Sequence, residues 1–271
     1  MPKKTKNPIL SVVIVNYNHK YFPRLALEAL ESSKTNFPFE VIFVDNASDP
    51  NDESVSFLSK AAKEKRITLI KSKKNLGFGA GNNLAFKKAK GEYILVHNPD
   101  TTVEEDSLQK ILSYIKKHPE IGILAPKLVY SNGDVQESCR RFMTFADLII
   151  KRTPLKKFSP WKARLKKYLM KDFNHEKTQE VDLVTGAMML ARRDFLWGEL
   201  KGFDERYFMF MEDFDLCQRT WKAGKRVVYF PEVTILHYHK RLSDGGLFSQ
   251  FCKHTFWMHL KSSFQYFWRW K

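Results

Sequence analysis

Short apolar runs alternate with amphipathic segments over the first hundred residues of the chain. The apolar runs are rich in Val and Ile, which predicts strands buried on both faces of a sheet. Strands and helices that alternate with such short connections are typical of a parallel α/β fold. The predicted strands lie at residues 9–15, 41–44, 67–70 and 93–96, and the predicted helices at 21–33, 52–63 and 82–90.

This regular alternation stops near residue 100. Asp100-Thr101-Thr102 has the side chains of a helix cap, and the helix predicted at 104–117 begins with three acidic residues that suit the positive end of its dipole. The Asn132-Gly133 pair predicts a hairpin between 127–130 and 135–138. The other predicted elements are a helix at 213–222 and strands at 181–184, 226–230 and 233–237.

Positive charge is concentrated in three segments. The 271 residues include 46 Lys and Arg against 30 Asp and Glu, which gives a net charge of +16. Residues 1–7, 151–177 and 253–271 contribute +3, +8 and +4 of this charge, so the rest of the chain is nearly neutral. The basic residues avoid the polar strand ends of the first half, and no nucleic-acid-binding module is visible. We therefore expect no nucleic-acid partner.

The composition argues against several other classes of protein. A content of 43% hydrophobic and 14% aromatic residues is enough for a folded core. No run approaches the roughly 18 uncharged apolar residues of a membrane span, and no signal-peptide cleavage site follows residues 9–15. Cys139, Cys217 and Cys252 are odd in number and far apart, which argues against a disulfide framework or a zinc site. We therefore expect a cytoplasmic setting.

Polar residues follow each predicted strand of the first half. In an open parallel sheet, ligands bind beyond the carboxyl ends of the strands. Any one of these loops alone would be an ordinary turn, but four together predict a binding site. The four loops are Asn16-Tyr17-Asn18, Asp45-Asn46, the Gly-rich segment 75–83 and Asn98-Pro99-Asp100.

Three of these loops carry groups that suit a nucleotide diphosphate. Gly77, Gly79 and Gly81 lead into a predicted helix, where free backbone N–H groups favour a phosphate. Asp45 can accept hydrogen bonds from a base or a ribose. Asp100 is a hard oxygen ligand that suits Mg²⁺ or Mn²⁺ on a diphosphate, and a helix cap is its alternative role.

An acidic pair opens the helix predicted at 213–222. Glu212 and Asp213 follow five consecutive large apolar residues, 207–211, which would form a partly dry wall beside them. A carboxylate at such a wall can work as a general base, and the alternative is an acidic helix start beside a core segment. His237, at the end of the last predicted strand, is a candidate metal ligand.

The order and spacing of these segments closely resemble the family 2 glycosyltransferases of GT-A fold, in particular their bacterial rhamnosyltransferase-like branch. The resemblance covers roughly residues 8–240 and ends at the strand that finishes with His237. The matching blocks are SVVIVNYN at 11–18, VIFVDNASDP at 41–50, NLGFGAGNN at 75–83, GEYILVHNPDT at 91–101, VTGAMMLARRDF at 184–195 and GFDERYFMFMEDFDLCQR at 202–219.

The resemblance implies an inverting transferase that takes a sugar from a nucleotide-diphosphate donor. Asp213 would be the base that deprotonates the acceptor hydroxyl, with Glu212 assisting acceptor placement. Asn98-Pro99-Asp100 stands where the family has its Asp-x-Asp element, so Asp100 would bind Mg²⁺ or Mn²⁺, and His237 would complete the metal shell. The other residues expected at the nucleotide sugar are Asn16, Tyr17, Asp45, Asn75, Gly77, Asn83 and Asn98.

The resemblance also indicates the substrates. The expected donor is dTDP-rhamnose, and the expected acceptor is a glycan or lipid-linked saccharide in bacterial cell-surface polysaccharide synthesis. Alternatives are a UDP-hexose or UDP-galactofuranose donor and a non-catalytic relative that only binds nucleotide or carbohydrate. A nucleotidyltransferase would need a Gly-rich loop after the first strand, where this chain has Asn16-Tyr17-Asn18-His19.

We expect a GT-A domain over 1–240, with a mixed, mostly parallel sheet flanked by helices. A nucleotide-binding half, 1–100, would precede an acceptor-binding half, 101–240, that carries a basic helical insertion at 151–177. A C-terminal tail of amphipathic helices, 241–271, would follow.

Apolar residues recur at helical spacing among basic residues in the insertion and in the tail. This pattern is typical of helices that lie on an anionic membrane surface, and packing onto the protein body or a second subunit is the alternative. We therefore expect peripheral association with the inner face of the cell membrane, and a homo-oligomer is left open. The apolar residues are Trp161, Leu165, Tyr168 and Leu169 in the insertion, and Phe256, Trp257, Leu260, Phe264, Phe267 and Trp268 in the tail.

Overall fold

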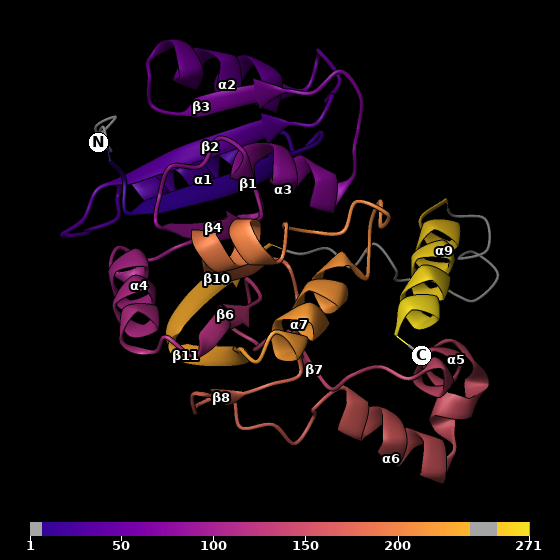
Figure 1. The fold of residues 1–271 in the computed structure, drawn as a ribbon. Coiled ribbons are helices and arrows are strands. Elements are labelled where there is room, and N and C mark those ends of the chain that lie inside the picture. Colours follow the sequence, from indigo (N-terminus) through magenta and orange to yellow (C-terminus); the bar gives the residue numbers. More distant parts are fainter. Residues whose placement is uncertain (1–6, 239–253, 271) are drawn as a thin grey trace.

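A computed structural model describes residues 7–238 and 254–270, and its central feature is one sheet flanked by helices (Figure 1). Pairing is parallel among the first four strands of the chain and between β6 and β11, and antiparallel on both sides of β10. The expected mixed, mostly parallel sheet is therefore confirmed. In spatial order the strands are β3 (Thr68–Lys71), β2 (Phe39–Asp45), β1 (Leu10–Asn16), β4 (Tyr93–His97), β10 (Met188–Arg192), β6 (Ile121–Val129), β11 (Arg226–His237) and β5 (Thr101–Thr102), with β8 (Gln179–Glu180) paired to β11.

Each connection between the first four strands carries the predicted helix. Pro23 lies in the first turn of the first helix, where its fixed φ angle and missing N–H are tolerated. The Asp52 carboxylate caps the second helix by accepting a hydrogen bond from the Ser54 N–H (3.0 Å). These helices are α1 (Phe22–Glu31), α2 (Glu53–Lys63) and α3 (Phe78–Phe86).

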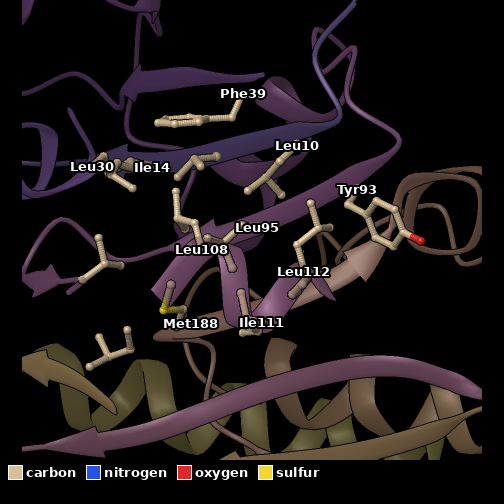
Figure 2. Close-up of a cluster of buried hydrophobic side chains, with 14 of the residues drawn as sticks. Leu10, Ile14, Leu30, Phe39, Tyr93, Leu95, Leu108, Ile111, Leu112 and Met188 are labelled. Carbon is tan, nitrogen blue, oxygen red and sulfur yellow. The ribbon is translucent and has the colours of Figure 1, made fainter. Parts of the chain in front are cut away.

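Apolar side chains from alternate strand positions fill both faces of the sheet. Leu10 and Ile14 of β1 belong to a cluster that packs α1, α2 and α4 (Ser107–Lys117) against one face (Figure 2). Val13 belongs to a second cluster, with Phe86 of α3 and Leu216 of α7 (Glu212–Lys222). Because successive side chains of a strand point to opposite faces, the two clusters lie on opposite sides of the sheet. This double burial explains why the strands are continuous apolar runs.

The basic insertion and the tail are helical, as predicted, and they pack together. The insertion contains a 3₁₀ turn (Pro154–Lys157) and α6 (Ser159–Tyr168), and α5 (Phe145–Arg152) leads into it from before its predicted start; the tail contains α9 (His254–Arg269). Figure 1 shows these helices gathered on the side of the molecule remote from β1, β2 and β3. A third apolar cluster joins them to the segment before α7 through Met143, Leu148, Tyr168, Tyr207, Met211 and Tyr266.

Two helices begin elsewhere than predicted. Helix α3 begins at Phe78 rather than at 82, so Gly79 and Gly81 lie inside it. Helix α4 begins at Ser107, so the three acidic residues at 104–106 precede it and do not form its first turn. Thr101 pairs with His237 in the sheet, and for this reason Asp100 is not part of a helix cap.

The predicted strands of the second half also differ in detail. The predicted strand 135–138 makes a single bridge, between Val135 and Val129, because the chain turns away after it. Of the predicted strand 181–184, only β9 (Leu183–Val184) is a strand, and it pairs with β7 (Cys139–Arg140); β8 ends before residue 181. The strands predicted at 226–230 and 233–237 form one strand, β11, with an irregular register between them.

Strand β10 lies within the block 184–195, for which the sequence pattern predicts no strand. Its apolar residues have no period that separates a buried strand from a buried helix. Some expectations concern residues outside the described ranges. These residues are Lys3, Lys4, Lys6, His239, Cys252, Lys253 and Lys271.

Candidate active site

Asn16 and Asp45 lie side by side at the carboxyl ends of β1 and β2, as their register shows. Asp45 is buried, and its carboxylate accepts a hydrogen bond from the Ser48 N–H (3.2 Å). The buried Asn16 amide donates to the hydroxyl groups of Ser48 (3.1 Å) and Ser54 (2.8 Å), and it thereby fixes the turn after β2. Tyr17, the next residue, is exposed.

The Gly-rich segment is held in place by Asn46. The Asn46 amide donates to the Asn75 side-chain oxygen (3.0 Å) and to the Gly77 carbonyl (3.1 Å). Gly77 has φ +83°, and a Cβ atom there would lie 1.9 Å from the Phe208 carbonyl oxygen, so the position requires glycine. The Phe78 N–H donates to this same carbonyl (3.1 Å). The start of α3 is thus fixed against the loop that precedes α7.

Asn83 lies further along α3 and joins it to the segment at 202–205. Its amide nitrogen donates to the Phe203 carbonyl (2.8 Å) and to the Glu205 carboxylate (3.0 Å). Its amide oxygen accepts from the Phe203 N–H (2.9 Å). These bonds make Asn83 a brace between the Gly-rich helix and the segment that leads to Glu212.

The pairing of β5 with the end of β11 brings Asp100 to His237. His237 Nε2 lies 3.5 Å from Asp100 Oδ1, and both side chains are largely buried. The Gln136 amide nitrogen donates to the His237 carbonyl (3.0 Å), so the Gln136 oxygen faces His237 Nδ1 (2.8 Å). Because this oxygen can only accept, Nδ1 carries a proton and Nε2 is the nitrogen presented to Asp100.

The gap between Asp100 and His237 suits a divalent cation. In the neutral imidazole, the Nε2 lone pair and the Asp100 oxygen are two acceptors that face each other. Asp100 Oδ1 is buried and accepts no hydrogen bond from any described residue. Within the described ranges, no three His, Cys, Asp or Glu side chains gather closely enough to hold a metal alone. A diphosphate and water would therefore complete the shell, as is usual for Mg²⁺ in nucleotide sites.

Two further histidines lie near Asp100. Burial alone would raise the pKa of Asp100, but the His237 ring that faces it and the charge of His19 hold this pKa below its usual value. His97, at the end of β4, contacts the Thr101 hydroxyl (3.0 Å). Burial lowers the pKa of His97 to about 4, so its ring is neutral at pH 7. Asp100 is therefore ionised and available to a cation.

The loop before α7 has a strained backbone. Phe210 and Met211 both have left-handed conformations, with φ of 69° and 70°. Such a conformation costs a residue other than glycine about 1–3 kcal/mol. Burial of Tyr207 and Met211 in the third apolar cluster offsets this cost. The turn delivers Glu212 and Asp213 as the first residues of α7, where free N–H groups stabilise negative charge.

Glu212 and Asp213 have different surroundings. Asp213 is half-buried, and its two oxygens accept hydrogen bonds from the N–H groups of Gly186 (3.0 Å) and Phe214 (2.9 Å). Glu212 is buried against Gly79, and its Oε2 accepts no hydrogen bond from a described residue. Burial raises the pKa of both carboxyl groups; the charge of Asp213 raises that of Glu212 further, whereas the N–H donors oppose the rise at Asp213. Glu212 therefore holds its proton more firmly than Asp213 does, so Asp213 is the better candidate for a general base.

A short series of contacts joins the Asp100 site to Asp213. The Asn98 N–H donates to the Ala187 carbonyl (2.9 Å), and the adjacent Gly186 N–H donates to Asp213. Residues 186 and 187 lead directly into β10, which is antiparallel to β4. The end of β4 and the start of β10 therefore connect the Asn98-Pro99-Asp100 element to Asp213.

Three residues that shape this site were not predicted to do so: Asn46, Gln136 and Arg140. Asn46 was noted only as a polar residue after a strand. Gln136 follows the Asn-Gly turn, and its contact with His237 arises because β6 and β11 are neighbours. The positive charge of Arg140, on β7, lowers the pKa of Asp213. These contacts span long stretches of sequence, so no local pattern reveals them.

Replacing the buried carboxyl group by Glu212→Gln is expected to make the protein more stable at alkaline pH. The folded state holds the Glu212 proton above the usual pKa of 4.5, while the unfolded state releases it there. Stability of the wild type therefore falls by about 1.4 kcal/mol per pH unit from 4.5 up to the raised pKa. The difference in melting temperature between E212Q and wild type should widen over this window.

The control for this experiment is Glu104→Gln, which changes an exposed carboxylate. Melting curves recorded between pH 5 and 9 should show no widening difference for E104Q. If E212Q and wild type lost stability in parallel as the pH rose, the proton would not reside on Glu212.

Comparison with known proteins gives a consistent result. The family model described as "Glycosyl transferase family 2" matches residues 11–199. The chain is 28% identical over 250 residues to an N-acetylglucosaminyl-diphospho-decaprenol L-rhamnosyltransferase of Mycobacterium tuberculosis, covering 88% of this chain and 78% of the relative. It is 29% identical to the rhamnosyltransferase WbbL of Escherichia coli, covering 94% of this chain and 91% of the relative.

A solved structure shares the fold at low sequence identity. The structure of GalNAc-T7 with UDP, GalNAc and Mn²⁺ superposes with a TM-score of 0.66 at 15% identity and covers 88% of this chain. The chain spans 45% of that protein, so the likeness concerns the fold alone. It confirms the expected GT-A architecture.

Proposed function

The chain belongs to glycosyl transferase family 2, and we propose that it transfers L-rhamnose from dTDP-rhamnose to a hydroxyl group of a lipid-linked saccharide. Inversion at the anomeric carbon would accompany the transfer. The observation that carries the proposal is the arrangement of two carboxylates. Asp100 is ionised and faces a gap that suits a cation, and Asp213, which a short series of contacts joins to it, has the raised pKa of a candidate base. A chain that only bound nucleotides would have no need for the second group.

The donor would lie across the carboxyl ends of β1, β2 and β4. In this proposal Asp45 accepts hydrogen bonds from the nucleotide base, with Asn16 and Tyr17 beside it. Asn75 and Gly77 border the diphosphate at the start of α3, where backbone N–H groups favour negative charge. Asn83 acts by holding α3, and Asn98 follows β4 at the sugar side.

Mg²⁺ or Mn²⁺ would be held by Asp100 and His237. A divalent ion bound there would neutralise charge on the departing diphosphate. Gln136 would orient His237 through its Nδ1 proton, as second-sphere partners of metal-binding histidines commonly do. A structural neighbour holds Mn²⁺ with UDP, which supports divalent-metal use without identifying the metal.

Asp213 would take the proton of the acceptor hydroxyl as that oxygen attacks the anomeric carbon. Its N–H partners at Gly186 and Phe214 keep the carboxylate oriented while one lone pair of each oxygen remains available. Glu212, protonated and buried, keeps a second negative charge away from the base and supports the wall at which the acceptor is placed. The strained turn at Phe210 and Met211 fixes the direction of the pair.

The name of one relative supports a proposal about where the reaction takes place. The mycobacterial relative is described as acting on an N-acetylglucosaminyl-diphospho-decaprenol, which is a lipid-linked acceptor. Within the described residues, no helix is long and apolar enough to cross a membrane. We propose a cytoplasmic enzyme that meets its acceptor at the inner face of the cell membrane.

A thermal-shift screen of nucleotide sugars tests the donor. At a donor concentration of about 100 Kd, binding adds about 2.7 kcal/mol to the stability of the folded state. This gain is expected to raise the melting temperature by roughly 5–10 °C for a chain of this size. With Mg²⁺ or Mn²⁺ present, dTDP-rhamnose should give a larger shift than UDP-glucose, UDP-N-acetylglucosamine or UDP-galactofuranose.

Asp45→Asn tests whether the shift comes from the proposed site, because it changes one buried atom at the contact proposed for the nucleotide base. The variant should lose most of the shift with dTDP-rhamnose. A largest shift with a UDP-sugar would contradict the proposed donor and leave the glycosyltransferase assignment intact.

A further inference from the structure

Helix α9 has aromatic residues on two faces: Tyr266 and Phe267 pack into the third apolar cluster, and a second set points outward. Ser262 and Ser263 are 2% and 1% exposed, whereas Phe264 and Trp268 are 65% and 68% exposed. With Trp257 and Leu260, the outward residues recur every three or four positions and form one stripe. The outward stripe sets α9 apart from an ordinary surface helix, whose outer face is polar.

Specific contacts hold α9 in this orientation. The Ser262 hydroxyl donates to the Met209 carbonyl (2.8 Å), and the Tyr266 hydroxyl donates to the Gln218 side chain. Just after α9, the Trp270 indole donates to the buried carboxylate of Asp215 on α7 (2.9 Å). The inner face of α9 is thus fixed to α7 and to the loop before it. The helix cannot turn its outward residues, such as Phe264 and Trp268, toward the protein without breaking these bonds.

The exposed large apolar residues of the molecule gather on this side. Nine of the thirteen found among the described residues lie on α5, the 3₁₀ turn, α6 and α9 or between them. The rings of Phe145 on α5 and Phe267 on α9 are in contact, with centroids 5.6 Å apart, so the helices adjoin. We call this region the α5–α9 surface; its nine residues are Phe145, Ile149, Leu155, Phe158, Trp161, Trp257, Leu260, Phe264 and Trp268.

Positive charge accompanies these apolar residues. Four exposed lysines lie on or beside the 3₁₀ turn and α6, and none forms an ion pair with a described residue: Lys156, Lys157, Lys162 and Lys167. The acidic residue of α5, Asp147, is buried and paired with Arg164 (2.7 Å). The described part of α9 contains no acidic residue. The α5–α9 surface is therefore apolar, aromatic and positive.

We propose that the α5–α9 surface binds an anionic phospholipid bilayer, with the aromatic side chains at the level of the headgroups. Trp and Phe favour this depth, and each nearby lysine adds attraction to anionic lipid. A second copy of the chain would bring like charges together at the same surface, which disfavours it as the occupant. The surface adjoins α7 and lies away from β1, β2 and β3, so a bilayer would lie on the acceptor side of the molecule (Figure 1). The inference does not depend on the proposed reaction.

Co-sedimentation with vesicles of two compositions tests the proposal. The wild type should bind vesicles of phosphatidylcholine mixed with phosphatidylglycerol at least about tenfold more tightly than vesicles of phosphatidylcholine alone. The double variant Phe264→Ser and Trp268→Ser should bind the mixed vesicles at least about tenfold more weakly than wild type. The triple variant Lys156→Gln, Lys157→Gln and Lys162→Gln should lose the preference for anionic lipid.

Matched controls use exposed residues elsewhere. Tyr21→Ser removes an exposed aromatic ring just before α1, and Lys63→Gln, Lys87→Gln and Lys88→Gln remove three exposed charges. Both control variants should bind as the wild type does. Donor hydrolysis should be unchanged in all of these variants, so failure of the membrane inference is separable from failure of the proposed reaction.

Three results would overturn the inference. The first is equal affinity for neutral and anionic vesicles, and the second is unchanged binding by F264S/W268S. The third is a dimer in gel filtration that F264S/W268S dissociates, since the surface would then belong to a second copy of the chain.

Discussion

Asp213→Asn is expected to lower kcat by about 10³-fold while the affinity for the nucleotide donor stays within about twofold of wild type. The substitution removes the lone pair and the charge that would accept the acceptor proton. It leaves the Asp100 site and the ends of β1 and β2 unchanged, because Asp213 touches neither. The measurements are initial rates at saturating donor and acceptor and calorimetric titration with dTDP.

Glu212→Gln is the matched control for this variant. The glutamine is isosteric with the protonated carboxyl group that we assign to Glu212, so E212Q should keep kcat within about tenfold of wild type. The rate of the wild type should fall as the pH is lowered through the raised pKa of Asp213, because the base is then protonated. A D213N enzyme with near-normal turnover, together with an inactive E212Q, would reverse the two roles.

Asp100→Ala is expected to weaken the metal-dependent binding of dTDP-rhamnose by about 100-fold or more. The substitution removes the carboxylate that faces His237 Nε2, and among the described residues of this gap the cation would keep only the imidazole. Loss of a residue that only hydrogen-bonds to a metal ligand already lowers metal affinity by about 10–100-fold. Calorimetric titration of dTDP with Mg²⁺, with Mn²⁺ and with chelator measures this effect without requiring turnover.

Gln136→Leu provides a graded comparison for Asp100→Ala. It keeps the volume of the side chain but removes the acceptor for His237 Nδ1, so the imidazole can turn and present the wrong nitrogen. Metal-dependent binding should weaken by about tenfold, less than for Asp100→Ala. Equal affinity of the wild type for dTDP with metal and with chelator would refute the assignment of Asp100.

The first half of the fold was predictable because its signals are local. β1, β2 and β4 are mostly apolar runs that are buried in the sheet, β3 is a shorter edge strand, and turn residues separate the strands from the helices. The start of α3 was misplaced because glycines usually end a helix, whereas Gly79 and Gly81 are packed against Phe203 and Val15 inside one. Close packing, which a sequence pattern does not record, decided this boundary.

The sequence predicts the individual residues of the candidate site better than it predicts their arrangement in space. Asp100, Asp213 and His237 could each be chosen from residue type and position after a strand or at a helix start. Their arrangement depends on β10 lying between β4 and β6 and on β5 pairing with β11, and both are long-range pairings. Which carboxyl group of the Glu212–Asp213 pair has the lower pKa depends on which one accepts the hydrogen bond from the Gly186 N–H. No sequence window contains that information.

The order of the strands has a consequence for biosynthesis. On the ribosome, β1 to β4 emerge first and can pair through short connections, but the second edge of β4 has no partner until β10 has been synthesised. The basic insertion must leave the exit tunnel in between. An unpaired strand edge is a template for aggregation, so the nascent chain is most vulnerable over this interval. Slow translation of the insertion would prolong that exposure, and a chaperone that covers the β4 edge would shorten it.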